Sequence, residues 1–474
     1  MITMPLDILL AQTDAASDLA ETLPSAADAV SPLGHSRTDI LSGYVGVLVV
    51  AFLVTLAATP IMRRLAIANG VVDNPGEARK AHRIPVAYLG GVAVFLGLVA
   101  GVGLSYFGGP LPDAIYQAHS SLHEQRAVPP SIVLGMALIM LTGLIDDVVG
   151  LMPRVKVAGQ LLAAAALAME EVGTNLARGV MKPIGEFIGN PDLTWAIDLP
   201  FTMPMVGTSF EIDVIYWVGT GIIAVFVLGA CNASNLVDGL DGLLSGVTAI
   251  AAAGLLIIAL NLAVLDFGGP TVESIGSLDS ARIIVALSLL GACLGFLPHN
   301  FNPATIFLGD CGSLLMGYVT IVLVLSLGDQ GMTHLVIAGL IIYSIPIMDT
   351  ALAIIRRKMA GLPMSAPDDQ HLHHMLKRAL GVKGAVLALY GLGIMFACLG
   401  VMLSMWKGRI VFTIALIITS FIGVYAVKVA RRRVLEEAAM KLMSKSQATP
   451  AGQPETPGTG RPRPEPDPKA PSPV

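Results

Sequence analysis

Asn-Ala-Ser-Asn-Leu-Val-Asp-Gly-Leu-Asp-Gly occupies residues 232–242, where two long apolar stretches, 214–231 and 242–262, approach each other. Its polar side chains recur every third residue, at Asn232, Asn235, Asp238 and Asp241. On a helix, residues three apart are neighbours, and the glycines allow turns and a close approach of the backbone to a ligand. Amide and carboxylate oxygens suit a hard cation such as Mg²⁺, which keeps substrate phosphates in its shell. The alternative is a polar loop between two helices.

The chain on either side of this stretch is strongly apolar. Hydrophobic residues make up 54% of the 474 residues and charged residues 13%, whereas soluble domains carry about a quarter charged residues. We therefore predict an all-α polytopic membrane protein with about 11 transmembrane helices of roughly 20 residues. The candidate spans, of which 131–146 and 156–170 are short, are 42–62, 88–107, 131–146, 156–170, 214–231, 242–262, 281–297, 313–327, 332–354, 385–405 and 409–429.

Lysine and arginine residues indicate the orientation of these spans, because cytoplasmic loops carry an excess of them. With the amino terminus outside, the inside segments contain Arg63, Arg64, Arg79, Lys80, Arg83, Arg154, Lys156, Arg356, Arg357, Lys358, Lys377, Arg378, Lys383, Arg431, Arg432 and Arg433. Fewer lie opposite: Arg37, Arg126, Arg178, Lys182, Arg282, Lys407 and Arg409. Four polar clusters, 144–147, 232–242, 307–313 and 371–374, then all face the cytoplasm. We expect a multi-pass protein of the cytoplasmic (inner) membrane with a cytoplasmic active-site cleft.

Three regions are expected along the chain. Residues 1–40 are acidic apart from Arg37, and we interpret them as an extracytoplasmic extension without a cleaved signal peptide. Residues 41–430 form the transmembrane domain, whose external loop 171–213 has short apolar-polar alternation that could form a hairpin. Residues 431–474 are expected to be a disordered cytoplasmic tail, because nine prolines lie between 450 and 474.

The cluster Leu-Ile-Asp-Asp ends the third span at 144–147. Adjacent carboxylates raise each other's pKa unless a cation compensates, and Lys156 can supply that charge to Asp146 and Asp147. The functional interpretation is phosphate and metal handling, with one aspartate as a base. The alternative, two solvated acids at the end of a span, stays open.

The cluster Phe-Leu-Gly-Asp-Cys-Gly-Ser precedes the eighth span at 307–313. Glycines around Asp310, at the start of a helix, can hold a metal-bound phosphate near backbone N–H groups. The same residues are also common in ordinary turns.

The fourth cluster contains His371, His373 and His374, flanked by Lys377 and Arg378. A zinc site is disfavoured because no cysteine partners lie nearby, and a solvated basic loop is the plain alternative. Contacts to a diphosphate fit the cluster better.

Three further residues face the same side. Lys80 and His82 either contact phosphate or serve as positive anchors of the membrane domain. Asp349, near the end of the ninth span, either orients the site or is a simple polar helix end. The four cysteines have no paired spacing, so we expect neither disulfides nor a cysteine metal site.

Together these segments resemble the polyprenyl-phosphate N-acetylhexosamine-1-phosphate transferases of glycosyltransferase family 4, which share a superfamily with the phospho-MurNAc-pentapeptide transferases. The resemblance covers about residues 45–430 and rests on the segments 73–82 (Asp-Asn-Pro-Gly-Glu-Ala-Arg-Lys-Ala-His) with Gly90 and Gly91, 146–147 with Lys156, 232–243, 307–313, 346–350 (Pro-Ile-Met-Asp-Thr) and 371–374. The His-x-His-His form is closer to the N-acetylhexosamine branch.

The resemblance implies a bundle of ten or eleven helices that transfers a sugar-1-phosphate, with GlcNAc as the expected sugar, from a UDP-N-acetylhexosamine to a polyprenyl (undecaprenyl) phosphate, releasing UMP. It implies a requirement for Mg²⁺, for which Mn²⁺ could substitute. The site residues that it implies are Asp310 and Asn235 for the metal, Asp146, Asp147 and Lys156 for catalysis at the lipid phosphate, and Asn232, Asp238, Asp241, His371, His373, His374, Lys80 and His82 for substrate binding.

Other functions fit the sequence less well. A transporter needs polar groups near the middle of the bilayer, and here they gather at the ends of spans. Asp-Gly-x-Asp-Gly also suggests a CDP-alcohol phosphotransferase, whose longer Asp and Arg pattern is missing, and a non-catalytic scaffold would leave the acids unexplained. A phospho-MurNAc-pentapeptide transferase is the nearest alternative. We expect no nucleic-acid partner and leave a homodimer open.

Overall fold

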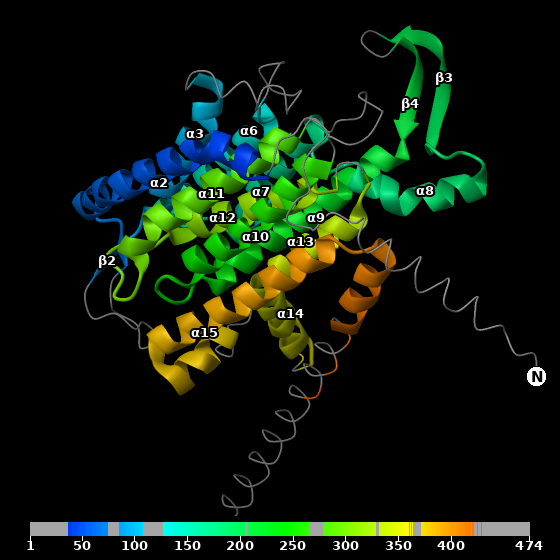
Figure 1. Ribbon diagram of the computed structural model, residues 1–474. Helices are drawn as coiled ribbons and strands as arrows, with labels where there is room; N and C mark the ends of the chain where they lie inside the picture. Colours follow the sequence, from blue (N-terminus) through cyan, green and yellow to red (C-terminus); the bar gives the residue numbers. More distant parts are fainter. Residues whose placement is uncertain are drawn as a thin grey trace, which may run out of the picture.

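The protein is described here by a computed structural model, which covers residues 37–73, 85–107, 127–203, 207–265, 278–328, 331–359, 361, 363, 371–418, 420, 424 and 428. Helices dominate these residues and pack into one bundle (Figure 1). The helices are α2 (Arg37–Ala68), α3 (Gly90–Phe107), α6 (Pro130–Val149), α7 (Pro153–Met169), α8 (Leu176–Ile188), α9 (Val214–Val237), α10 (Leu243–Leu265), α11 (Asp279–Asn300), α12 (Gly309–Ser326), α13 (Thr333–Ile342), α14 (Ser344–Met359) and α15 (Leu372–Ser404).

The described helices confirm an all-α polytopic membrane protein. Seven of them are long and apolar enough to cross a membrane, and α13 with α14, bent by 81° at their junction, gives an eighth. The other predicted spans coincide with the shorter helices α3, α7 and Gly408–Ile418. A full crossing takes about 20 residues, so the predicted number of eleven spans is not established.

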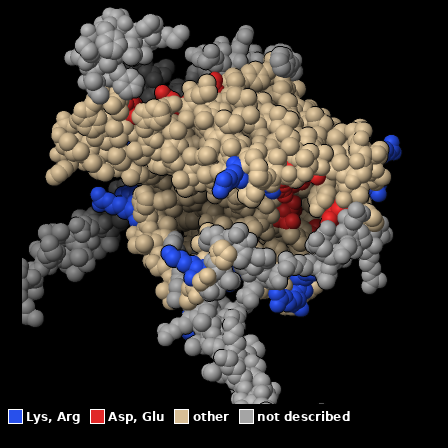
Figure 2. Space-filling view, turned by 180° about the vertical axis from the view of Figure 1, so that it is seen from behind, with Lys and Arg blue, Asp and Glu red and all other residues tan. Residues whose placement is uncertain are grey.

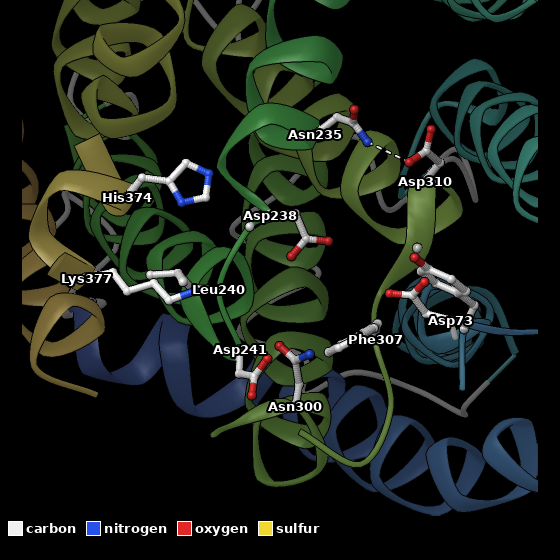
Figure 3. A pocket seen from close by; sticks show the side chains of 13 residues that line it. Asp73, Asn235, Asp238, Leu240, Asp241, Asn300, Phe307, Asp310, His374 and Lys377 are labelled. Carbon is white, nitrogen blue, oxygen red and sulfur yellow. Dashed lines mark hydrogen bonds between the residues drawn. The ribbon is translucent and has the colours of Figure 1, made fainter. Parts of the chain in front are cut away.

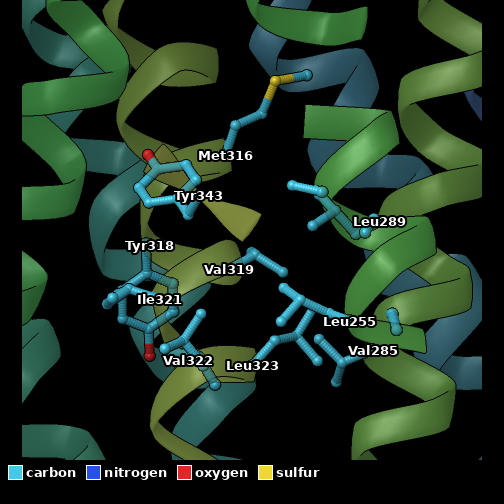
Figure 4. Close-up of a cluster of buried hydrophobic side chains, with 14 of the residues drawn as sticks. Leu255, Val285, Leu289, Met316, Tyr318, Val319, Ile321, Val322, Leu323 and Tyr343 are labelled. Carbon is cyan, nitrogen blue, oxygen red and sulfur yellow. The ribbon is translucent and has the colours of Figure 1, made fainter. Parts of the chain in front are cut away.

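The centre of the bundle is α12, whose side chains are buried on every side. Such a helix is expected where a chain is apolar all round, because no face of it needs to meet water. Val319 and Leu323 of α12 lie opposite Leu255 of α10 and Val285 of α11 (Figure 4). This packing fixes the position of α12, and the first turn of α12 carries Asp310.

The segment after α7 contains more structure than expected. The predicted hairpin is present as β3 (Thr194–Met203) paired antiparallel with β4 (Gly207–Asp213). The amphipathic helix α8 precedes it and was not predicted, because its 13 residues contain Pro183 and two glycines. The carboxylate of Asp213 then accepts a hydrogen bond from the backbone N–H of Tyr216 at 3.0 Å, which caps the start of α9.

A second, very short sheet lies at the opposite end of the bundle. Strand β1 (Val72–Asp73) pairs antiparallel with β2 (Val86–Ala87). Ala87 also forms a parallel bridge to Ile306, and Phe307 N–H donates to the Ala87 carbonyl at 2.8 Å. These bonds fix the chain just before α12 against the chain just before α3.

Candidate functional site

A cavity of about 380 Å³ opens where the ends of α9, α11, α12 and α15 meet (Figure 3). Sites for small organic ligands commonly have about 300–1,000 Å³. The lining residues come from most of the predicted clusters and are Asp73, Tyr88, Asn235, Asp238, Gly239, Leu240, Asp241, Asn300, Phe307, Gly309, Asp310, His374 and Lys377. Acidic side chains gather in a hollow on one face of the molecule (Figure 2).

The N-terminus of α12 is fixed by a carboxylate from α6. Asp147 accepts hydrogen bonds from the backbone N–H groups of Asp310 at 2.7 Å and Cys311 at 3.0 Å. A negative charge is favourable at a helix N-terminus, whose first N–H groups have no partner within the helix. Gly309 is required for this contact: its φ is +71°, and an added Cβ would lie 2.4 Å from Asp147 Oδ2. Asp147 therefore holds the backbone of Asp310 and the first turn of α12.

Asp310 lies at the centre of a network that joins three helices. Its Oδ2 accepts a hydrogen bond from Lys156 Nζ of α7 at 2.6 Å, and its Oδ1 accepts one from Asn235 Nδ2 of α9 at 2.8 Å. Lys156 Nζ also lies 2.5 Å from Asp146 Oδ2 of α6. Asn235 Nδ2 lies 2.9 Å from Ser313 Oγ, one turn into α12. Lys156 thus pairs with the carboxylates of Asp146 and Asp310. The predicted compensation by Lys156 is present at Asp146, whereas Asp147 is bound by the N-terminus of α12 instead.

The loop between α9 and α10 adds two carboxylates to the cavity. Asp241 Oδ2 accepts hydrogen bonds from Asn302 Nδ2 at 2.8 Å and the Ala304 N–H at 3.1 Å. Asp238 points toward the cavity between Asp310 and Asp241 (Figure 3), and no described residue donates a hydrogen bond to its carboxylate. Burial, followed by repulsion from neighbouring carboxylates, raises the pKa of Asp238 to about 8. A half-buried carboxylate to which no described residue donates a hydrogen bond favours a bound cation.

The chain between α11 and α12 forms another wall of the cavity. Asn300 Oδ1 accepts hydrogen bonds from the Gly242 N–H at 3.1 Å and Ser245 Oγ at 3.0 Å, and Asn300 Nδ2 donates to the Ile306 carbonyl. Asn300 therefore joins the start of α10 to the segment that leads into α12. The rings of Tyr88 and Phe307 lie with their centroids 6.0 Å apart and give this wall an aromatic surface.

The histidine cluster is oriented by α14. Asp349 Oδ2 lies 3.0 Å from His371 Nδ1 and 3.7 Å from His373 Nδ1, and Asp349 Oδ1 accepts from the Leu372 N–H at 2.8 Å. The ring of His373 packs against Gly239, where a Cβ would lie 2.4 Å from Nε2. His374 and, one turn on, Lys377 line the cavity. The predicted orienting contact of Asp349 is present, and it acts through His371 and His373.

One predicted residue, Asn232, lies away from the cavity. Asn232 Nδ2 donates to Gln160 Oε1 of α7 at 2.9 Å and to the Leu228 carbonyl, and Asn232 is not among the residues that line the cavity. It links α9 to the helix that carries Lys156. Lys80 and His82 lie outside the described residues.

Several lining residues were not anticipated as site residues. Phe307 and Asp73 begin the quoted segments 307–313 and 73–82, and Lys377 was noted as a basic flank. Tyr88 and Asn300 carried no signal beyond being polar groups at the edge of an apolar stretch.

The donors present fit a cation that brings other ligands with it. Among the described residues, no three His, Cys, Asp or Glu side chains converge tightly enough to hold a metal ion. Asp310 and Asn235 nevertheless lie side by side, and the carbonyl oxygen of Asn235 accepts no hydrogen bond from the described chain. Mg²⁺ is typically held by one or two carboxylates, with substrate phosphates and water completing its shell. The residues present therefore fit Mg²⁺ that arrives with a phosphate-bearing substrate.

Known proteins resemble this chain over most of its length. The model of the family described as "Glycosyl transferase family 4" matches residues 129–328, which include Asp146, Lys156, Asn235 and Asp310. A Bacillus subtilis protein named "Probable undecaprenyl-phosphate N-acetylglucosaminyl 1-phosphate transferase" is 32% identical over 387 residues, covering 79% of this chain and 91% of the relative.

Two further relatives match a smaller share of this chain. A "Decaprenyl-phosphate N-acetylglucosaminephosphotransferase" of Mycobacterium tuberculosis is 31% identical over 338 residues, which are 69% of this chain and 74% of that protein. A "Phospho-N-acetylmuramoyl-pentapeptide-transferase" of Desulforudis audaxviator is 32% identical over 282 residues, which are 56% of this chain and 71% of that protein. The similarity extends further along this chain for the N-acetylglucosamine relatives.

Proposed function

The chain belongs to glycosyl transferase family 4, and from this premise we propose that it transfers N-acetylhexosamine-1-phosphate, with GlcNAc-1-phosphate as the expected group, from a UDP-sugar to membrane polyprenyl phosphate. The products are polyprenyl-diphospho-sugar and UMP. The observation that carries the proposal is Asp310, held between Lys156 and Asn235 at the edge of an acidic cavity. This first membrane-bound step would supply a lipid-linked sugar for cell-envelope glycan synthesis.

The location of the cavity suits a reaction between a soluble and a lipid substrate. Asp147, Asp238 and Asp310 lie at ends of apolar helices. A polyprenyl phosphate keeps its chain in the bilayer and its phosphate at the surface, so both substrates can meet at such a boundary. The distribution of lysine and arginine supports a cytoplasmic position for this end of the bundle and for the carboxyl terminus, with the amino terminus outside.

A divalent cation is part of the proposal. Asp310 and Asn235 would hold Mg²⁺, with Mn²⁺ as a substitute. When bound, the ion supplies positive charge to the diphosphate of the UDP-sugar and to the leaving UMP. Four carboxylates line the cavity, those of Asp73, Asp238, Asp241 and Asp310, and they would otherwise repel a diphosphate.

The donor substrate would occupy the cavity. Lys377 and His374 lie across it from Asp310, where they can meet phosphate or sugar oxygens (Figure 3). Asp241 and Asn300 supply polar groups beside the aromatic wall formed by Tyr88 and Phe307, which suits a flat, polar-edged base. We assign this side to the nucleotide and the histidine side to the sugar diphosphate.

The acceptor phosphate would meet Asp146 and Lys156. Lys156 can attract the phosphate, and Asp146 can position it or take its proton. An oxygen of the lipid phosphate then attacks the phosphorus attached to the sugar, and the bond from that phosphorus to the oxygen shared with UMP breaks.

We favour this direct attack over a covalent aspartyl intermediate. Both oxygens of Asp147 accept backbone N–H groups of α12, so its carboxylate positions Asp310 and is poorly placed as a nucleophile. A phosphosugar adduct trapped on an aspartate with UDP-[³²P]GlcNAc in the absence of acceptor lipid would contradict the direct route.

The test is a transfer assay with the purified full-length protein in lipid nanodiscs that contain undecaprenyl phosphate. UDP-GlcNAc, UDP-GalNAc and UDP-MurNAc-pentapeptide are supplied separately, and lipid-extracted product and released UMP are quantified. We expect equal amounts of lipid product and UMP with UDP-GlcNAc. Product with UDP-MurNAc-pentapeptide alone would replace the proposed substrate by that of the alternative, and no product with any UDP-sugar from a folded protein would refute the proposal.

A further inference from the structure

The external helix α8 presents an apolar face that the rest of the described chain does not cover. Val180, Ile184, Phe187 and Ile188 follow the i, i+4, i+7, i+8 spacing of one helix face. Their exposed fractions are 56%, 47%, 93% and 59%. Exposed apolar side chains that are scattered singly need no explanation, but a contiguous stripe on a helix marks a contact surface.

A second face of α8 is polar. Arg178, Lys182 and Glu186 are spaced four residues apart and are exposed. A helix of low overall hydrophobicity that separates a basic polar face from a face rich in Phe and Ile is typical of helices that lie in a membrane interface. Long basic side chains next to such a stripe can reach lipid phosphates while their stems cover apolar surface.

The first turn of the same apolar face is buried and fixes where α8 begins, because Ala177 lies seven residues before Ile184. Ala177 is fully buried in a small cluster with Leu193 and Ile215, and Val214 and Val218 pack against this cluster. Val214, Ile215 and Val218 belong to the first turns of α9, where this span enters the membrane. Gly179 also packs against the Gly331 carbonyl just before α13, where a Cβ on Gly179 would lie 2.5 Å from that oxygen. Figure 1 shows α8 at the outer edge of the bundle beside the start of α9.

Two tryptophans near this anchor also indicate that α8 lies at the boundary between hydrocarbon and water. Trp217, in the first turn of α9, and Trp195, in the first residues of β3, are 62% and 44% exposed. Tryptophan is enriched where membrane proteins cross from hydrocarbon to water. An apolar stripe attached at this level meets lipid before it meets bulk water.

We propose that α8 is an interfacial anchor whose Val180–Ile184–Phe187–Ile188 face inserts into the external leaflet of the bilayer, while Arg178 and Lys182 contact lipid headgroups. The occupant of the apolar face is lipid. The anchor ties the segment between α7 and α9, including the β3–β4 hairpin, to the membrane surface, and it does not depend on the transferase activity.

Spin-label accessibility in nanodiscs of phosphatidylethanolamine and phosphatidylglycerol tests this placement. The full-length protein carries Cys398→Ser to remove its exposed cysteine, and the other three native cysteines are buried. Single cysteines are introduced by Phe187→Cys and Ile184→Cys on the apolar face, and by Lys182→Cys as the matched control on the polar face. Collision rates with oxygen, which concentrates in lipid, are compared with those of a water-soluble nickel chelate.

The expected result is an oxygen-to-nickel ratio severalfold higher for labels at 187 and 184 than for the label at 182. A high nickel accessibility at 187, equal to that at 182, would place the apolar face in water and overturn the proposal. Low accessibility to both reagents at 187, with broadening from a second label nearby, would mean that another copy of the chain covers the face and would also overturn it. Because each variant changes one exposed side chain, circular dichroism and elution volume suffice to show that it is folded.

Discussion

Replacing Gly309 by alanine should disable the site through two separate effects. The residue has a φ of +71°, and a left-handed conformation costs a residue with a Cβ about 1–2 kcal/mol. The new methyl group would also lie 2.4 Å from Asp147 Oδ2, so this carboxylate must move away from the N-terminus of α12. Each of its two hydrogen bonds to backbone N–H groups is worth about 1.5–3 kcal/mol, because one partner is charged.

The displacement matters because Asp310 follows Gly309 directly. A misplacement of about 1 Å in a reacting group costs roughly 100-fold in rate. We therefore expect kcat/KM for transfer from UDP-GlcNAc to fall by about 100-fold in Gly309→Ala, with a lower midpoint of thermal unfolding.

Gly189→Ala is the matched control. Gly189 also has a positive φ, +81°, but no other part of the chain lies within 4 Å of an added Cβ. This variant pays the backbone cost alone, and its kcat/KM should equal that of the wild type. If Gly309→Ala transferred sugar phosphate as fast as Gly189→Ala, Asp147 would not position Asp310 and the reasoning would be refuted.

Three further predictions concern residues around the cavity. In the folded protein the pKa of Asp238 is raised from its ordinary value of 3.8 to about 8. Between about pH 4 and pH 8 the folded protein therefore keeps a proton that the unfolded chain has released, so stability falls as the pH rises through this range. Asp238→Asn should remove this fall and abolish transfer; thermal unfolding without metal that shows parallel pH curves for both proteins would contradict this. Tyr343→Phe removes a hydroxyl that contacts Ser234, which is next to Asn235. This variant should raise the Mg²⁺ concentration for half-maximal rate severalfold, with little change in kcat. Tyr318→Phe is the control for loss of a buried hydroxyl, and an equal shift in both variants would argue against a positioning role for Tyr343. Asp349→Asn should weaken the hold on His371 and raise the KM for UDP-GlcNAc more than that for the lipid, and an unchanged KM for UDP-GlcNAc would be evidence against a donor-side role for the histidines.

The helical fold could be predicted because its cause is local. Long apolar runs between polar clusters require helices in a bilayer, where backbone groups must bond within their own segment. The boundaries were less predictable. The helix α9 runs on to Val237 and so carries Asn232 and Asn235, because nothing in that stretch breaks a helix before Asp238.

The site was predictable as a set of groups but not as a network. Asp310 and Asn235 were recognisable, because polar residues in a strongly apolar chain are conspicuous. Asp147, by contrast, meets the N-terminus of α12 across 163 positions of sequence, and only packing brings the two together. The pairing of Asn232 with Gln160 and the aromatic wall formed by Phe307 have the same origin.

The 81° bend between α13 and α14 also escaped prediction. The stretch 332–354 was interpreted as one straight span, although Pro346 lies three residues after Tyr343 and proline commonly kinks a helix. In the fold its side chain is fully buried and contacts the last turns of α9 at Ser234 and Ala230. The bend directs α14 so that Asp349 reaches the histidine cluster.

The central claim is that Asp310 directs cation-dependent transfer of sugar phosphate to a membrane lipid. The most direct measurement is the formation of lipid-extractable label from radiolabelled UDP-GlcNAc and undecaprenyl phosphate by the wild type and by Asp310→Ala, each with Mg²⁺ and with EDTA. The account predicts label with the wild type and Mg²⁺, and loss of that label with EDTA or with Asp310→Ala in a folded protein. Undiminished label from Asp310→Ala, or from the wild type in EDTA, would contradict it.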